Sequence, residues 1–256
     1  MKQKILDLDI NYEIYGEDNK EIIVLLHGWG ANLKTMEPIA KKMQGNYKIY
    51  SVDFPGFGES PEPERAYNVS DYARVILEFL NVNEIKDAVL IGHSFGGRVI
   101  TKLVGELGYK PKKIVYVDSA GVKPKRSFSY YFKVYSYKLA KNVIKLFNSK
   151  EKAEEIIKRL RANSGSDDYR NASDNMKKTF VNVVNEDLTY LFSKIDVPTL
   201  LVWGENDLDT PIREAKVFEK HIKDSGLVIL KGAGHYSYLD KLGEFIIILN
   251  SFLEGE

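Results

Sequence analysis

The sequence contains no cysteine. This absence excludes disulfide bonds, a thiol nucleophile and any metal site built on thiolates, and it fits a reducing compartment. A strong excess of charge of one sign is also missing, because 37 Lys and Arg residues face 36 Asp and Glu residues and leave a formal net charge of +1. The overall charge therefore does not indicate a nucleic acid as a partner.

Long apolar stretches are missing as well. The first ten residues carry Lys and Asp and lack the apolar core of a signal peptide. The longest apolar runs, such as 22–26 and 245–249, are too short to cross a bilayer. We therefore expect a cytoplasmic protein without stable membrane insertion. As a separate expectation, the protein acts as a monomer or a homodimer.

Short β-branched runs alternate with helical patterns over the first 120 residues, which predicts βαβ units and a mostly parallel sheet with helices on both faces. The chain of 256 residues is long enough for one such core with a modest insertion. The expected strands are 4–10, 12–15, 21–26, 48–52, 88–91 and 114–117, and the expected helices are 35–43, 70–80 with Ser70 as N-cap, and 95–107.

The alternation stops between residues 121 and 196, where no strand pattern is found. Helical patterns cover 150–161, 174–184 and 188–192, and apolar residues, several of them aromatic, recur every three or four positions between 128 and 146. Strands at 199–203 and 227–230 and a helix at 241–253 then complete the core. We interpret 1–120 and 197–256 as one α/β core and 121–196 as a helical insertion.

A serine motif lies at the centre of the core. Gly92-His93-Ser94-Phe95-Gly96 follows a buried strand and precedes a helix, which is the context of the G-x-S-x-G nucleophile elbow. The glycines leave room for a tight turn that holds the Ser94 hydroxyl clear of the sheet. On its own, the motif also fits an ordinary glycine-rich turn.

A serine hydroxyl needs a basic partner, usually a histidine oriented by a carboxylate. Of the four histidines, His235 lies in a loop directly after a strand, whereas His221 falls on an exposed helix. Asp207 follows the strand at 199–203, so the order along the chain is Ser, Asp, His, as in α/β-hydrolases. Ser94, Asp207 and His235 are the predicted catalytic triad.

An oxyanion hole needs two backbone N–H groups. Phe95, the residue after the serine, supplies one. The second is expected in His27-Gly28-Trp29-Gly30, after the strand at 21–26, from Trp29 or alternatively from Gly30. We expect His27 to fix this loop rather than to contact substrate.

These segments, together with Asp53–Ser60 and Pro211, resemble the α/β-hydrolase superfamily over nearly the full chain. The resemblance implies the α/β-hydrolase fold, with 121–196 as a cap, and a carboxylesterase-like serine hydrolase acting on a small-molecule ester without metal or cofactor. A C–C hydrolase of the meta-cleavage type, a thioesterase, a cofactor-free perhydrolase and a non-catalytic receptor are the alternatives. Because some members carry their acid after the preceding strand, Asp118 is the alternative to Asp207.

The cap is expected to supply the substrate pocket. Its aromatic residues Phe128, Phe132 and Tyr135 would line an apolar pocket, or simply attach the cap to the core. Arg98, in the helix after Ser94, would meet a substrate carboxylate or form a structural ion pair. The lysine-rich face of the cap is either a solvated surface or a surface that attracts anionic substrates or a membrane.

Overall fold

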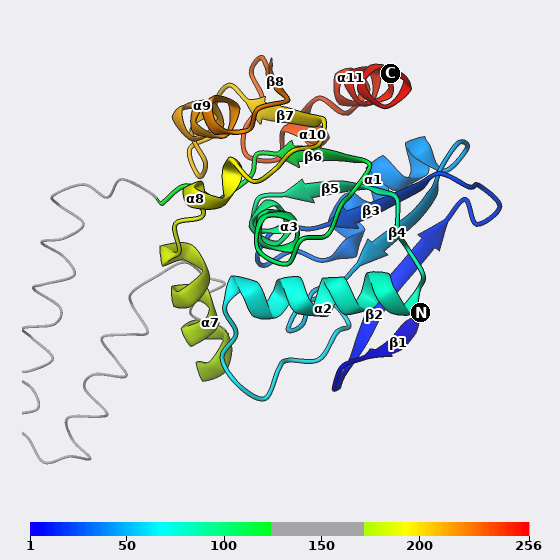
Figure 1. Cartoon of the computed structure of the whole chain (residues 1–256), viewed down its shortest axis with the longest axis vertical. Helices are drawn as coiled ribbons and strands as arrows, with labels where there is room; N and C mark the ends of the chain where they lie inside the picture. Colours follow the sequence, from blue (N-terminus) through cyan, green and yellow to red (C-terminus); the bar gives the residue numbers. More distant parts are fainter. Residues whose placement is uncertain (124–171, 256) are drawn as a thin grey trace, which may run out of the picture.

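The computed structural model describes residues 1–123 and 172–255, and these residues are built around one twisted sheet (Figure 1). Its strands are β1 (Lys2–Ile5), β2 (Leu8–Tyr15), β3 (Ile22–Leu26), β4 (Lys48–Val52), β5 (Ala88–His93), β6 (Lys113–Val117), β7 (Thr199–Gly204) and β8 (Ser225–Leu230). Their order across the sheet is β1-β2-β4-β3-β5-β6-β7-β8. Strand β2 pairs antiparallel with β1 and β4, and all other pairs are parallel, which confirms the predicted mostly parallel sheet.

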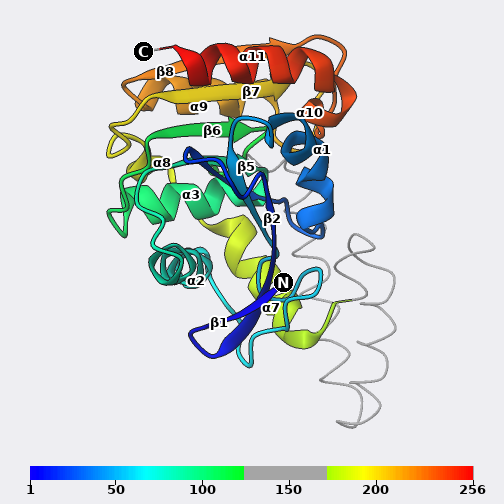
Figure 2. The same cartoon turned by 90° about the vertical axis from the view of Figure 1, so that its right-hand side faces the viewer.

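Helices cover both faces of this sheet. They are α1 (Leu33–Met43), α2 (Val69–Val82), α3 (Phe95–Gly105), α7 (Asp174–Asn185), α8 (Thr189–Phe192), α9 (Ile212–His221), α10 (Ser237–Asp240) and α11 (Leu242–Glu254). Figure 2 shows β8, β7, β6 and β5 following one another across the sheet, with α11 beyond β8 in that view.

The two faces are separated by the alternation of side chains along each strand. In β3, Val24 and Leu26 belong to the core cluster that includes α2, α3 and α9. Ile23 and Leu25 belong to the other cluster, which includes α1 and α11. The continuous apolar run of β3 is therefore explained by burial on both faces, as the sequence predicts.

The described strands and most of the described helices lie where the sequence predicts them, apart from their ends. The sequence predicts α9 only as the helix that carries His221, and it does not predict α10. Two further details differ. The expected strand 4–10 is instead a hairpin, because the chain turns at Leu6, whose φ is 52°, between β1 and β2. The N-cap of α2 is Asn68 rather than Ser70. The Asn68 side chain accepts from the Asp71 N–H, and the Asp71 carboxylate accepts from the Asn68 N–H, forming a capping box that begins two residues earlier than predicted.

The described end of the predicted insertion contains α7 and α8, which are helical as expected. The Tyr67 N–H donates to Thr179 Oγ1 at 2.9 Å, and Asn182 Nδ2 donates to the Tyr67 carbonyl at 3.1 Å. These bonds hold α7 beside the start of α2 (Figures 1 and 2). The helix expected at 150–161 and the predicted pocket residues Phe128, Phe132 and Tyr135 lie outside the described residues.

Among the helices of the described part of the chain, none combines the length and the apolar character needed to cross a bilayer.

Candidate active site

Ser94 occupies a strained turn between β5 and α3. Its φ of 48° and ψ of −106° lie outside the regions that non-glycine residues commonly adopt. Two hydrogen bonds hold this turn: the Ser94 N–H donates to the Val117 carbonyl, and the Ala120 N–H donates to the Ser94 carbonyl, each at 3.0 Å. The strained conformation of Ser94 is thus held by the last residue of β6 and by Ala120, just after that strand.

The glycines of the motif permit close approach between backbone segments. A Cβ atom on Gly92 would lie 2.7 Å from the carbonyl carbon of Gly96. A Cβ atom on Gly96 would collide with the carbonyl oxygen of Leu26, at the end of β3. Glycine at these positions therefore lets α3 start directly against the strand ends, as the motif predicts.

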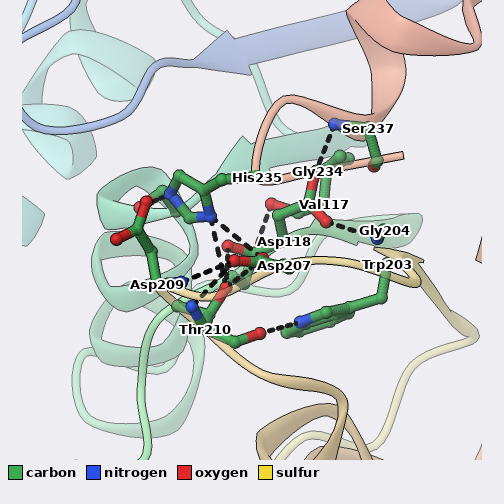
Figure 3. Close-up of polar contacts among 12 residues, drawn as sticks. Val117, Asp118, Trp203, Gly204, Asp207, Asp209, Thr210, Gly234, His235 and Ser237 are labelled. Atoms are coloured by element: carbon green, nitrogen blue, oxygen red, sulfur yellow. Dashed lines mark hydrogen bonds and ion pairs between the residues drawn. The ribbon is translucent and has the colours of Figure 1, made fainter. Parts of the chain in front are cut away.

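His235 lies in the loop after β8, and its ring reaches Ser94. Its Nε2 atom is 3.0 Å from Ser94 Oγ, and its Nδ1 atom is 3.0 Å from Asp207 Oδ2 (Figure 3 shows His235 and Asp207). Because an ionised carboxylate can only accept, Nδ1 carries the proton and Nε2 accepts the Ser94 hydroxyl. The structure therefore brings the three residues predicted as a triad into one hydrogen-bonded chain.

Asp207 is held by four donors. Oδ1 accepts from the N–H groups of Asp209 and Thr210 at 2.9 and 3.0 Å, and Oδ2 faces the Thr210 hydroxyl at 2.6 Å in addition to His235. Burial would raise the pKa of Asp207, but the hydrogen bonds from His235 and Thr210 outweigh it and keep the pKa below its ordinary value. Asp207 is thus ionised at neutral pH.

The charge of Asp207 acts in turn on His235. Burial would lower the pKa of His235, but the hydrogen bond and negative charge of Asp207 outweigh it and raise the pKa above its ordinary value. The side chain of His235 is 16% exposed. The imidazole can therefore hold a proton and remains accessible at the surface.

Asp118, the alternative acid, makes no hydrogen bond to His235. Its Oδ1 accepts from the Gly204 N–H at 2.8 Å, and its Oδ2 accepts from the Ser237 N–H at 2.9 Å (Figure 3). Burial raises the pKa of Asp118 to about 7. Asp118 thus connects the end of β7 to the start of α10, two residues after His235. Asp207 is the carboxylate in contact with the imidazole.

The loop after β3 lies against Ser94. A Cβ atom on Gly28 would lie 3.4 Å from the Cβ atom of Ser94. Phe95 begins α3, so its N–H has no partner within the helix. The Trp29 ring packs against Phe95 with centroids 5.4 Å apart. These positions are compatible with Trp29 and Phe95 as oxyanion donors, and that role stays a prediction, as does the alternative role of Gly30.

His27 holds the same loop from within the core. Its side chain is buried, its Nε2 accepts from the Phe54 N–H at 3.1 Å, and its Nδ1 lies 2.7 Å from the Gly28 carbonyl. It fixes the loop, as the sequence predicts. His221 is exposed on α9, where its Nδ1 lies 2.8 Å from the Val217 carbonyl.

Arg98 is 3% exposed and donates from its guanidinium to the Glu186 carbonyl at 2.8 Å. This bond joins α3 to the segment between α7 and α8. Among the described residues, this contact is to a backbone carbonyl and not the expected ion pair with a carboxylate. The contact of Arg98 with a substrate carboxylate stays a prediction.

Two partners of the site have no distinct signal in the sequence. Thr210 follows Asp207 at a spacing that many turns share, and its hydroxyl and N–H both face the carboxylate. His93 precedes Ser94, and its Nε2 lies 2.8 Å from the carbonyl oxygen of His235. Since a carbonyl only accepts, His93 Nε2 carries a proton, and burial lowers the pKa of His93 to about 3.

Asp207, Asp209 and His235 have one potential ligand atom each within 4.8 Å of one another. Both ring nitrogens of His235 already face hydrogen-bond partners, Ser94 and Asp207. We therefore describe this cluster as a hydrogen-bonded network and assign no metal to it.

Comparison with known proteins identifies a related fold and related sequences. A family model described as the alpha/beta hydrolase fold matches residues 21–242. The chain is 24% identical over 248 residues to a pimeloyl-(acyl-carrier protein) methyl ester esterase of Neisseria meningitidis serogroup C, covering 91% of this chain and 93% of that relative.

Solved structures agree with the fold. An esterase from Exiguobacterium antarcticum has a TM-score of 0.77 and 23% identity and covers 99% of both chains. An enol-lactonase from Burkholderia xenovorans has a TM-score of 0.76 and 20% identity and covers 100% of both chains. At these identities the likeness establishes a shared fold.

Proposed function

Because this chain belongs to the α/β-hydrolase family, we propose that it is a serine hydrolase that cleaves carboxylic esters. The observation that carries the proposal is the hydrogen-bonded chain from Ser94 Oγ through His235 to Asp207, with both links at 3.0 Å. Its support from sequence is the relative that is named a methyl ester esterase. Ser94 is the nucleophile, His235 the general base and Asp207 the acid of the triad.

The first half-reaction forms an acyl-enzyme. His235 Nε2 removes the hydroxyl proton while Ser94 Oγ attacks the acyl carbon of the ester. The carbonyl oxygen becomes negatively charged, and the N–H groups of Phe95 and Trp29 stabilise it. Collapse of this intermediate breaks the bond to the alcohol oxygen, which takes the proton from His235 as the alcohol leaves.

The second half-reaction releases the acid. His235, neutral again, removes a proton from water as that water attacks the acyl carbon of the Ser94 ester. The same N–H groups hold the second oxyanion, and protonation of Ser94 Oγ by His235 releases the carboxylic acid. Asp207 stays ionised throughout and stabilises the imidazolium in each intermediate.

We assign residues 121–196 to a cap that covers Ser94 and shapes the substrate pocket. The anchoring of α7 to Tyr67 by Thr179 and Asn182 supports this assignment, because it fixes the end of the insertion on the core. The aromatic rings of Trp29 and Phe180, 5.3 Å apart, join α7 to the loop beside Ser94. We propose that these two rings border the place of the acyl group, where they would favour an apolar chain.

The proposal is tested with p-nitrophenyl esters of increasing acyl length. We expect the wild-type protein to hydrolyse at least one of them. Ser94→Ala should lose activity by several orders of magnitude, because it removes the hydroxyl that forms the acyl-enzyme. Ser225→Ala, at the start of β8, is the matched serine control and should keep wild-type turnover. Hydrolysis by Ser94→Ala at a rate near that of the wild type would refute the mechanism.

A further inference from the structure

The segment 117–120, which begins with the last residue of β6, contacts the segments that carry all three triad residues. It holds the turn at Ser94 through the Val117 carbonyl and the Ala120 N–H. Within the same segment, Asp118 contacts the segments on which Asp207 and His235 lie. A displacement of this segment would therefore change all three positions together.

Asp118 makes these contacts through both oxygens of its carboxylate and through its backbone carbonyl. Its carboxylate accepts from the N–H of Gly204, the last residue of β7, at 2.8 Å. It also accepts from the N–H of Ser237, two residues after His235, at 2.9 Å. Its backbone carbonyl lies 2.9 Å from the Thr210 hydroxyl, which also faces Asp207. Asp118 therefore connects the acid loop to the histidine loop (Figure 3).

The local conformation of Asp118 is costly, which argues that its position is demanded by these contacts. Its φ is 45°, a left-handed value that most non-glycine residues avoid, and its side chain is fully buried. A buried carboxylate with two N–H donors is stabilised as an acceptor in a way that no neutral side chain of the same shape can reproduce.

We propose that Asp118 is a positioning residue that fixes the distance between Asp207 and His235 by holding the ends of both loops. This inference rests on the proposed esterase function. His93 acts on the opposite side of the same loop, because its Nε2–H donates to the carbonyl oxygen of His235. The histidine loop is thus held at residue 235 by β5 and at residue 237 by the segment after β6.

Several charged or titratable groups surround the imidazole of His235. Asp207 and Asp209 face it from the loop after β7, Asp118 acts on it from the end of β6, and the neutral ring of His93 lies beside it with centroids 5.0 Å apart. The negative charges of Asp207, Asp209 and Asp118 all raise the pKa of His235. Asp118 carries its full charge only above its raised pKa of about 7, and in that range we expect the loss of this charge to lower the pKa of His235.

The substitution Asp118→Asn keeps the shape but replaces one acceptor with an NH₂ group that faces an N–H donor. One of the two bonds is lost, so one loop end is released. Because small misplacements of reacting groups cost up to about a hundredfold in rate, we expect kcat to fall about 10- to 100-fold with little change in KM. Asp118→Ser, which is smaller and introduces no clash, is the second variant.

The matched control is Asp53→Asn. Asp53 is also a buried carboxylate that accepts backbone N–H groups, from Leu33 at 2.7 Å and Glu59 at 2.9 Å, but it holds neither the acid loop nor the histidine loop. Both substitutions are expected to lower the melting temperature. Only a change at Asp118 is expected to change the ionisation of His235.

The deciding measurement is an NMR titration of the imidazole Cε1–H signals, which is simple in a chain with four histidines. It is combined with kcat and KM on a p-nitrophenyl ester. We expect a lower His235 pKa and a lower kcat in Asp118→Asn and an unchanged His235 pKa in Asp53→Asn.

Wild-type values of both quantities in Asp118→Asn would overturn the positioning role. So would failure of both Asp118 variants to fold while Asp53→Asn folds, because Asp118 would then serve folding alone. Absence of ester hydrolysis in the wild-type protein would refute the proposed function instead, and the NMR titration would still test the effect of Asp118 on His235.

Discussion

Asp207→Asn is the substitution whose consequence follows most directly from the hydrogen bonds of the site. The two oxygens of Asp207 have different partners: Oδ1 accepts two backbone N–H groups, and Oδ2 faces His235 Nδ1 and the Thr210 hydroxyl. Backbone N–H groups cannot turn away, so the amide oxygen of Asn must take the place of Oδ1. Its NH₂ group then points at His235.

An NH₂ group beside Nδ1 selects the wrong tautomer of the imidazole. Nδ1 must then accept, the proton moves to Nε2, and Nε2 can no longer accept the proton of Ser94. The same exchange in other serine hydrolases lowers kcat about 10⁴-fold, which corresponds to about 5 kcal/mol of transition-state stabilisation. Shape and the two backbone hydrogen bonds are retained, so folding should change little.

The assay is the steady-state hydrolysis of a p-nitrophenyl ester by purified wild-type and Asp207→Asn protein, with circular dichroism to verify the fold. Asp209→Asn is the matched control, because it removes a negative charge near His235 from an exposed side chain but keeps the N–H that Asp207 accepts. We expect a fall in kcat of about 10⁴-fold for Asp207→Asn and a small change for Asp209→Asn. An Asp207→Asn enzyme within tenfold of the wild type would refute the assignment of the acid.

Further predictions concern pH, packing and the support of the acid. Only neutral His235 accepts a proton, and its pKa is raised, so kcat/KM should increase with pH through a midpoint above about 6.5. A midpoint below that pH would contradict the pairing of His235 with Asp207. Gly96→Ala should lower the free energy of unfolding, measured by chemical denaturation, by about 3 kcal/mol, because the new Cβ would meet a backbone carbonyl. Gly226 has open space around it, so the free energy of unfolding of Gly226→Ala should differ from that of the wild type by less than about 0.5 kcal/mol. Thr210→Val removes the hydroxyl 2.6 Å from Asp207 Oδ2 and should lower kcat about tenfold in the ester assay at unchanged KM; an unchanged kcat would show that the hydroxyl is dispensable.

The sheet and the turn at Ser94 could be predicted from sequence because both depend on local patterns. A continuously apolar strand such as β3 indicates burial on both faces, and a serine flanked by glycines between a strand and a helix indicates a tight elbow. By contrast, the sequence predicts the wrong N-cap for α2, because Asn68 and Ser70 are both good caps and the reciprocal hydrogen bond of Asp71 decides between them.

The sequence favours Asp207 as the acid of the triad and leaves Asp118 as the alternative. Both follow neighbouring parallel strands, so both reach the same edge of the sheet. The difference between them lies in backbone geometry. Asp118 has a left-handed φ, and its carboxylate accepts hydrogen bonds from the N–H groups of Gly204 and Ser237. The longer loop after β7 brings the Asp207 carboxylate to His235. Local sequence patterns likewise do not predict contacts between segments far apart in the chain, such as the contact of His93 with the His235 carbonyl.

The most direct test of the central claim is covalent labelling of the native protein with a fluorophosphonate probe, followed by mass spectrometry of the modified peptide. An activated serine reacts with such a probe, whereas an ordinary serine hydroxyl does not. We predict one equivalent of label on Ser94, together with loss of ester hydrolysis, and no labelling of Ser94→Ala. A wild-type protein that hydrolyses esters while Ser94 stays unlabelled, or a Ser94→Ala protein that labels as well as the wild type, would contradict the assignment of Ser94 as the nucleophile.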